Sequence, residues 1–282
     1  MFITKLFFLL NLLSNTALPA LCESYPTIIM HGLASDKNEL ELFSNSLSKL
    51  VIGKNMVYNM VYNMEIGNGK LTSMFMNLDE QCAIFSDNVR SLNITDEKIN
   101  IIGFSQGGLI ARCYLEEYSH KVKKVNTLIT IATPHMGVYK EPKIIPPVTN
   151  YYWKNPFQYF NTNKFILYLN NEVGHINSET YRNNIKLLSN FIIIWSNIEN
   201  VITPKESSKF EYYNIEKAIN EKVLKIVPFL NSSLYINDLL GIKYLYFDNR
   251  LIFYEIDCKH EEFKLPTCFN DMGLLNIIIK YL

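Results

Sequence analysis

The stretch KINIIGFSQGG, residues 98–108, determines the fold prediction. Residues 98–104 form an apolar run typical of a buried β-strand, and residues 106–118 follow the spacing of a helix. Between them the pattern G-x-S-x-G places Ser105 at a sharp strand-to-helix turn, where glycines two positions away avoid side-chain collisions. We therefore predict Ser105 as a nucleophile; the alternative is a glycine-rich turn whose serine only caps the helix.

Strands and helices alternate in both directions from this turn. Apolar runs predict further strands at residues 26–30, 126–132, 191–195 and 251–256, and one more at 55–64, which contains the tandem unit MVYNMVYNM. Helical spacing occurs at residues 39–50, 79–91 and 272–282. This alternation predicts an α/β protein with a mostly parallel, doubly wound sheet, the architecture of the α/β-hydrolase fold. Residues from 134 to about 190 are irregular and predict a helical insertion on that sheet.

The composition favours one globular domain. A chain of 282 residues with 48% apolar residues can bury a single sizeable core. The 27 basic and 27 acidic side chains cancel, so nothing favours nucleic acid or an acidic membrane surface as a partner. The cysteine and histidine spacings resemble no zinc site, and we predict neither a metal nor a cofactor.

The first 22 residues have the order of a secretory signal peptide. Lys5 precedes an apolar stretch at residues 6–13, and small residues follow near Ala20 and Cys22, after either of which cleavage is plausible. The apolar stretch is too short for a comfortable membrane span, and the alternative is an uncleaved anchor or a buried helix. Residues 23–282 would then form the mature hydrolase domain in the secretory pathway, with no stable membrane span.

The secretory pathway is oxidising, so the four cysteines that follow the predicted signal peptide are candidates for disulfide bonds. Cys258 and Cys268 flank His260 and are the favoured disulfide, although four cysteines allow three connectivities and free thiols are an alternative. The other two cysteines are Cys82 and Cys113. Two glycosylation sequons, at Asn93 and Asn231, fit the same compartment.

A serine nucleophile needs a base and an acid. In the α/β-hydrolase fold the acid and then the histidine follow the serine, and the histidine lies after the last strand. Only His260 lies between the run at 251–256 and the final helix, so it is the candidate base rather than a surface histidine. Glu199 is the next carboxylate after the run at 191–195 and is the candidate acid; Asp257 is its rival.

The oxyanion of the tetrahedral intermediate needs two N–H donors. One is the backbone N–H of Gln106, directly after the nucleophile. The other is expected from the loop after the first strand, where His31-Gly32-Leu33 offers the N–H of Leu33. We interpret His31 as structural, because it packs this loop.

Several motifs have one family in common. They are MHGL at 30–33, EIGNG at 65–69, GFSQGG at 103–108, PHMGVY at 134–139, YWKNP at 152–156, NNE at 170–172, YRNN at 181–184, VITP at 201–204 and LGIK at 240–243. With these, from about residue 26 to its C-terminus, the chain resembles the palmitoyl-protein thioesterases, lysosomal α/β-hydrolases that remove fatty acyl groups from cysteine. EIGNG, the glutamine after the nucleophile and the YW-x-x-P pattern are far more specific than the serine turn alone.

The resemblance implies the same triad and oxyanion donors as above. It further implies hydrolysis of long-chain fatty-acyl thioesters, palmitoyl above all, with an acylated protein, an acylated peptide or acyl-CoA as partner. Apolar residues of the insertion are candidates to line an acyl groove, the alternative being that they pack against the sheet. They are Phe157, Tyr159, Phe160, Phe165, Ile166 and Leu169.

The sequence departs from the family pattern in three places. The acid is Glu199 where the family usually has aspartate, the cysteine set is reduced, and the segment between Tyr139 and Tyr152 is shorter, which predicts a trimmed lid. Two other functions remain as alternatives: a lipase or carboxylesterase on the same triad, and a catalytically inactive lipid-binding relative.

Overall fold

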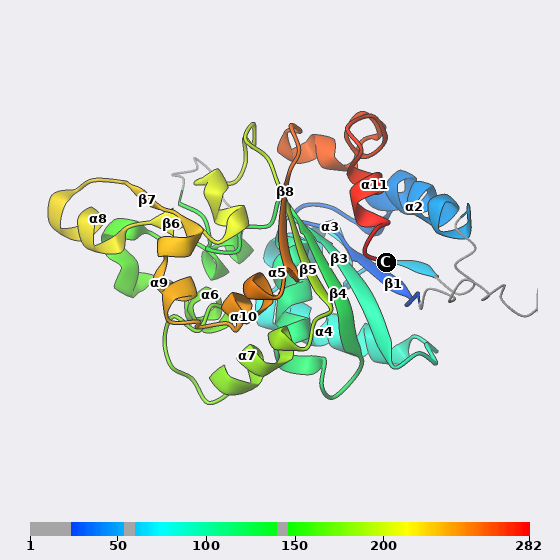
Figure 1. Cartoon of the computed structure of the whole chain (residues 1–282), viewed down its shortest axis with the longest axis horizontal. Helices are drawn as coiled ribbons and strands as arrows, with labels where there is room; N and C mark the ends of the chain where they lie inside the picture. The colour runs from blue at the N-terminus through cyan, green and yellow to red at the C-terminus, as the bar shows by residue number, and fades with distance from the viewer. Residues whose placement is uncertain (1–23, 54–59, 140–145) are drawn as a thin grey trace, which may run out of the picture.

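A computed structural model describes residues 24–53, 60–139 and 146–282 (Figure 1). The proposed signal peptide lies outside these residues, as do residues 56–59 of the tandem MVYNMVYNM unit. Every strand of the central sheet comes from one of the predicted apolar runs, because buried strands of this kind are nearly continuous hydrophobic segments. Among the described residues, no helix is both long and apolar enough to cross a bilayer.

Six parallel strands form the central sheet in the order β2-β1-β3-β4-β5-β8. Their bounds are β1 (Thr27–Met30), β2 (Val61–Met64), β3 (Lys98–Phe104), β4 (Lys124–Ile131), β5 (Asn190–Trp195) and β8 (Leu251–Glu255). The register pairs Phe104 with Ile131 and Ile194 with Tyr254, so the carboxyl ends of neighbouring strands meet at one edge. A doubly wound sheet presents its ligand sites at that edge.

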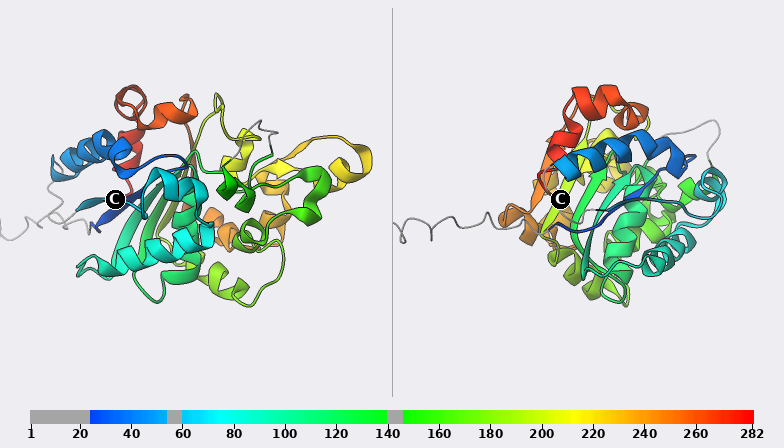
Figure 2. Two further views of the ribbon diagram at one scale, coloured as in Figure 1. Left: turned by 180° about the vertical axis from the view of Figure 1, so that it is seen from behind. Right: turned by 90° about the vertical axis from the view of Figure 1, so that its right-hand side faces the viewer.

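The two faces of the sheet carry separate cores. Ile28 and Ile101 belong to one apolar cluster, whereas their neighbours Ile29 and Ile102 belong to the other, since successive side chains of a strand point to opposite faces. Helices α4 (Leu78–Ser91) and α5 (Gln106–Cys113) cover the first face. Figure 2 shows α2 (Glu41–Gly53) and α11 (Leu274–Ile278) together on the second face.

Two helices differ from their predicted lengths. The pattern at 106–118 is α5 followed by a π-helical turn, η2 (Tyr114–Tyr118). The predicted C-terminal helix at 272–282 is shorter: a π-turn, η8 (Thr267–Asp271), precedes it, and Gly273 at φ +77° separates that turn from α11. Helical periodicity predicted helical structure in both segments, but it does not distinguish α-helical from π-helical turns.

The predicted insertion is irregular and helical, as expected. It contains η3 (Pro147–Tyr151), η4 (Pro156–Asn161), α6 (Lys164–Leu169) and α7 (Ser178–Lys186). The sequence pattern did not reveal a second insertion, residues 196–250, between β5 and β8. This segment holds η5 (Lys205–Lys209), β6 (Tyr212–Tyr213), α8 (Ile215–Glu221), β7 (Ile226–Val227), η6 (Phe229–Asn231), α9 (Ser233–Ile236) and α10 (Ile242–Phe247). Helix α8 packs on η4, so the two insertions lie side by side (Figure 1).

Candidate active site

Ser105 occupies a strained turn between β3 and α5. Its backbone has φ 52° and ψ −124°, a conformation that non-glycine residues rarely adopt. A Cβ on Gly103 would lie 2.5 Å from the Cα of Gly108, and one on Gly107 would lie 2.3 Å from the carbonyl oxygen of His31. The glycines of the motif are therefore required by close backbone approaches, and the turn places the Ser105 hydroxyl at the carboxyl edge of the sheet.

His260 is the first residue of η7 (His260–Lys264), after β8. Its Nε2 lies 2.9 Å from the Oγ of Ser105 across 155 residues of sequence, and its own backbone N–H donates to Oδ1 of Asn200. The side chain is only 8% exposed. An imidazole in this position can accept the serine proton.

Glu199 completes the hydrogen-bonded series. Its Oε2 lies 2.9 Å from Nδ1 of His260, and its Oε1 accepts from the backbone N–H groups of Val201 and Ile202 at 2.7 and 3.2 Å. Burial acts to raise the pKa of Glu199, but hydrogen bonds from His260 and the two N–H groups outweigh it, so the pKa is lowered. The rival carboxylate, Asp257, is exposed to solvent.

The loop after β1 lies against Ser105. A Cβ on Gly32 would approach the Cβ of Ser105 to 3.0 Å, and both residues line one cavity together with Leu33. Gln106 is anchored by its side chain, whose Nε2 donates to the carbonyl oxygen of Ser73 at 2.8 Å and whose Oε1 accepts from the hydroxyl of Tyr152 at 3.1 Å. Sequence reasoning considered only the backbone of Gln106 and missed this anchoring.

The cavity beside Ser105 has a volume of about 450 Å³ and mostly apolar walls. Its apolar lining comprises Leu33, Ala34, Leu40, Phe104, Ile131, Ala132, Pro134, Val138, Pro146, Tyr152, Trp153, Val201, Ile202 and Phe263. None of the six insertion residues proposed for the groove is among them. Phe165, Ile166 and Leu169 are buried in the core instead, and Phe160 is 88% exposed. For these three buried residues the alternative, packing in the core, is the one that the structure shows, because apolar character alone does not distinguish packing from lining.

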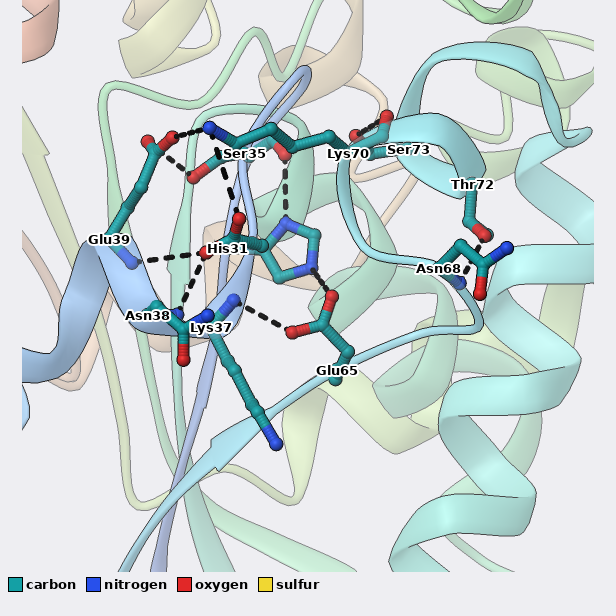
Figure 3. Close-up of polar contacts among 12 residues, drawn as sticks. His31, Ser35, Lys37, Asn38, Glu39, Glu65, Asn68, Lys70, Thr72 and Ser73 are labelled. Atoms are coloured by element: carbon teal, nitrogen blue, oxygen red, sulfur yellow. Dashed lines mark hydrogen bonds and ion pairs between the residues drawn. The ribbon is translucent and has the colours of Figure 1, made fainter.

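Ser35 and Lys264, which line this cavity, belong to an ion-pair network that is shown in part in Figure 3. Glu39 accepts from Lys264, Lys70 and Ser35 at 2.6, 2.7 and 2.9 Å. Burial acts to raise the pKa of Glu39, but these three donors lower it to about 2. The network joins the loop after β1 to η7, the segment that carries His260.

Two disulfides brace the site. Cys258 and Cys268 are bonded, as the sequence favoured, and close the loop that contains His260. Cys82 and Cys113 form the second bond, between α4 and the end of α5. Among the described residues, no group of three or more histidine, cysteine, aspartate or glutamate side chains could hold a metal ion.

A serine, an imidazole and a carboxylate in hydrogen-bonded series at the carboxyl edge of a parallel sheet define a serine hydrolase of the α/β-hydrolase fold. The model of the palmitoyl protein thioesterase family matches residues 26–260, and the chain belongs to that family. It is therefore a hydrolase of the thioesterase type.

Curated relatives include palmitoyl-protein thioesterase 3 of Dictyostelium discoideum, 29% identical over 90% of this chain and 91% of the relative. The lysosomal thioesterase PPT2 homolog of Drosophila melanogaster is 25% identical over a match that covers 80% of this chain and 82% of the relative. Among solved structures, a lipase-esterase related protein from Clostridium acetobutylicum aligns with a TM-score of 0.48 and 14% identity, covering 92% of this chain and 96% of the other.

Proposed function

We propose that the protein hydrolyses long-chain fatty-acyl thioesters, palmitoyl above all, through an acyl-enzyme on Ser105. The observation that carries this proposal is the series Glu199–His260–Ser105, with both contacts at 2.9 Å, opening on a mostly apolar cavity. S-acylated proteins or peptides and acyl-CoA are the candidate substrates. Two relatives whose names are thioesterases support the bond type.

In the first step His260 takes the proton of Ser105 while the hydroxyl oxygen attacks the thioester carbonyl carbon. The carbonyl oxygen becomes an oxyanion, stabilised by the backbone N–H groups of Leu33 and Gln106. The carbon–sulfur bond then breaks and the thiol leaves with the proton from His260. Water, deprotonated by the same imidazole, hydrolyses the acyl-enzyme, while Glu199 stabilises the imidazolium in both steps.

The acyl chain would supply most of the binding free energy. Each buried methylene contributes about 0.8 kcal/mol, so a chain of about fourteen gives roughly 10 kcal/mol before ordering costs. The cavity described above, whose walls include Leu40, Phe263 and Trp153, is the proposed acyl site. Half of the segment between Tyr139 and Tyr152 in which a shortened lid is expected, residues 140–145, lies outside the described part of the chain.

We further propose that the protein enters the secretory pathway and works in lysosomes or after export. The N-terminal signal pattern supports entry, and the lysosomal address rests on relatives such as the bovine lysosomal thioesterase PPT2. The sequon residues Asn93 and Asn231 are both exposed, which is compatible with glycosylation.

A fluorophosphonate probe and matched substrates test this function. Labelling of the purified protein that disappears in Ser105→Ala supports a serine hydrolase, whereas a folded protein that never labels indicates a lipid-binding relative. Turnover of palmitoyl thioesters should exceed that of the corresponding oxygen esters and glycerides. The reverse order would identify a lipase or carboxylesterase, and shorter acyl chains measured in parallel give the chain-length preference.

A further inference from the structure

His31 is a buried histidine directly before the proposed oxyanion loop. It is the first residue after β1, and its side chain is only 1% exposed. Its Nδ1 lies 2.9 Å from the carbonyl oxygen of Gly32. A carbonyl oxygen only accepts hydrogen bonds, so Nδ1 carries a proton and donates it.

The carbonyl of Gly32 and the N–H of Leu33 belong to one peptide unit. This bond is trans, since the cis bond of the described chain is Thr203–Pro204. In a planar trans peptide the C=O and N–H point in opposite directions. A side chain that fixes the carbonyl of Gly32 therefore also fixes the direction of the Leu33 N–H, and a hydrogen bond to that carbonyl polarises the N–H on its other side.

The side chain of Glu65 lies on the other side of the same imidazole ring, facing Nε2 (Figure 3). Its Oε1 lies 3.8 Å from Nε2 of His31, which has no hydrogen-bond partner of its own. Its Oε2 accepts from the backbone N–H of Lys37 at 2.9 Å, four residues beyond Leu33. Both ring nitrogens of His31 thus face oxygen atoms: Nδ1 faces the carbonyl of Gly32 and Nε2 faces the carboxylate of Glu65.

The glycines of the EIGNG motif make room for this carboxylate. A Cβ on Gly69, which has φ +53°, would lie 2.0 Å from Oε1 of Glu65. The backbone at Gly67, with φ +54°, places the N–H of Asn68 within 2.8 Å of Thr72 Oγ1, which closes the turn. The motif therefore builds a tight turn over Glu65.

We infer that His31 and Glu65 are positioning residues for the Leu33 N–H, acting in series through the carbonyl of Gly32. The inference rests on the proposed function, in which that N–H stabilises the oxyanion. Neither side chain touches the substrate in this scheme. Their contribution is expected in the transition state, because a donor aimed at the oxyanion contacts the ground-state carbonyl less closely.

The test compares His31→Ala, Glu65→Ala and Glu65→Gln on a palmitoyl thioester. We expect both alanine variants to lower kcat by about tenfold or more, less than the 10²–10³ typical for losing an oxyanion donor, with KM changed less than about threefold. The double variant should be no slower than His31→Ala, since the two residues act in series. Glu65→Gln should remain within about threefold of the parent, because its amide oxygen can still accept from the Lys37 N–H and its side chain has nearly the same size beside the His31 ring.

Exposed residues provide matched controls: Glu221→Ala and His120→Ala should leave kcat unchanged. Thermal melts monitored by circular dichroism ensure that each kcat is measured on folded protein. Parental kcat in both alanine variants, or an equal loss in Glu65→Ala and Glu65→Gln, would overturn the inference while Ser105→Ala remains inactive. Full activity in Ser105→Ala would instead overturn the proposed function.

Discussion

Oε2 of Glu199 lies 2.9 Å from Nδ1 of His260 although a glutamate is one methylene longer than the usual aspartate. The extra length is accommodated because the other carboxylate oxygen is fixed by the N–H groups of Val201 and Ile202 in the loop after β5. The loop backbone therefore holds the carboxylate at the distance the imidazole requires.

This arrangement predicts a severe effect of removing the carboxylate. Glu199→Ala should lower kcat on the order of 10⁴-fold, since His260 would lose its orientation and its imidazolium would lose stabilisation. Asp257→Ala should remain near the parent, because that side chain is exposed. Steady-state rates on one thioester measure both, and the opposite pattern would assign the acid role to Asp257.

Gly107, in the turn that carries Ser105, has no room for a side chain, whereas Gly174 does. Gly107→Ala should destabilise the protein by about 1–3 kcal/mol and reduce kcat, because its Cβ would overlap the carbonyl oxygens of Met30, at the end of β1, and of His31, directly before the proposed oxyanion donor loop. Gly174→Ala is the control, since nothing lies within 4 Å of its Cβ. The free energy of unfolding in urea and kcat are measured for both variants. Equal stability and equal kcat in Gly107→Ala and Gly174→Ala would contradict the prediction.

The two disulfides should contribute differently to stability and activity. The bonds span 31 and 10 residues, so replacing both cysteines by serine should cost about 4 kcal/mol for Cys82–Cys113 and about 3 kcal/mol for Cys258–Cys268. Only the second loop carries His260. At temperatures where both variants are folded, the Cys258–Cys268 variant should show the lower kcat, and a comparable kcat in both would show that this loop needs no covalent brace.

The ion-pair network around Glu39 should persist in acid. Since its pKa is lowered to about 2, the carboxylate contributes stability that is present above the ordinary value near 4.5 and is lost as the pH falls toward 2. Glu39→Gln should therefore lower Tm by roughly 1–3 °C at pH 7 and equally at pH 5. The difference should shrink as the pH is lowered further. A difference that is already absent at pH 5 would contradict this assignment.

Local patterns were sufficient for the sheet and for the turn that carries Ser105. The apolar run 98–104 coincides with β3, because a strand buried on both faces must be apolar at nearly every position. The second insertion, residues 196–250, escaped prediction since its elements are short and lack a sustained period. Tyr152, which binds Gln106, and Glu65, which faces His31, carry no local signal of those contacts.

The sequence by itself determined the class of fold, and it supplied Ser105 at the glycine-bounded turn as the candidate nucleophile and His260 and Glu199 as its candidate partners by their order along the chain. Only the tertiary structure decided that the carboxylate facing the His260 imidazole is Glu199, which residues line the cavity, and that Glu65 of the EIGNG motif faces His31. The physical reason is that strand and turn preferences act between neighbours, whereas these contacts join residues tens to more than a hundred positions apart. Chain order alone does not specify which of several similar side chains meet.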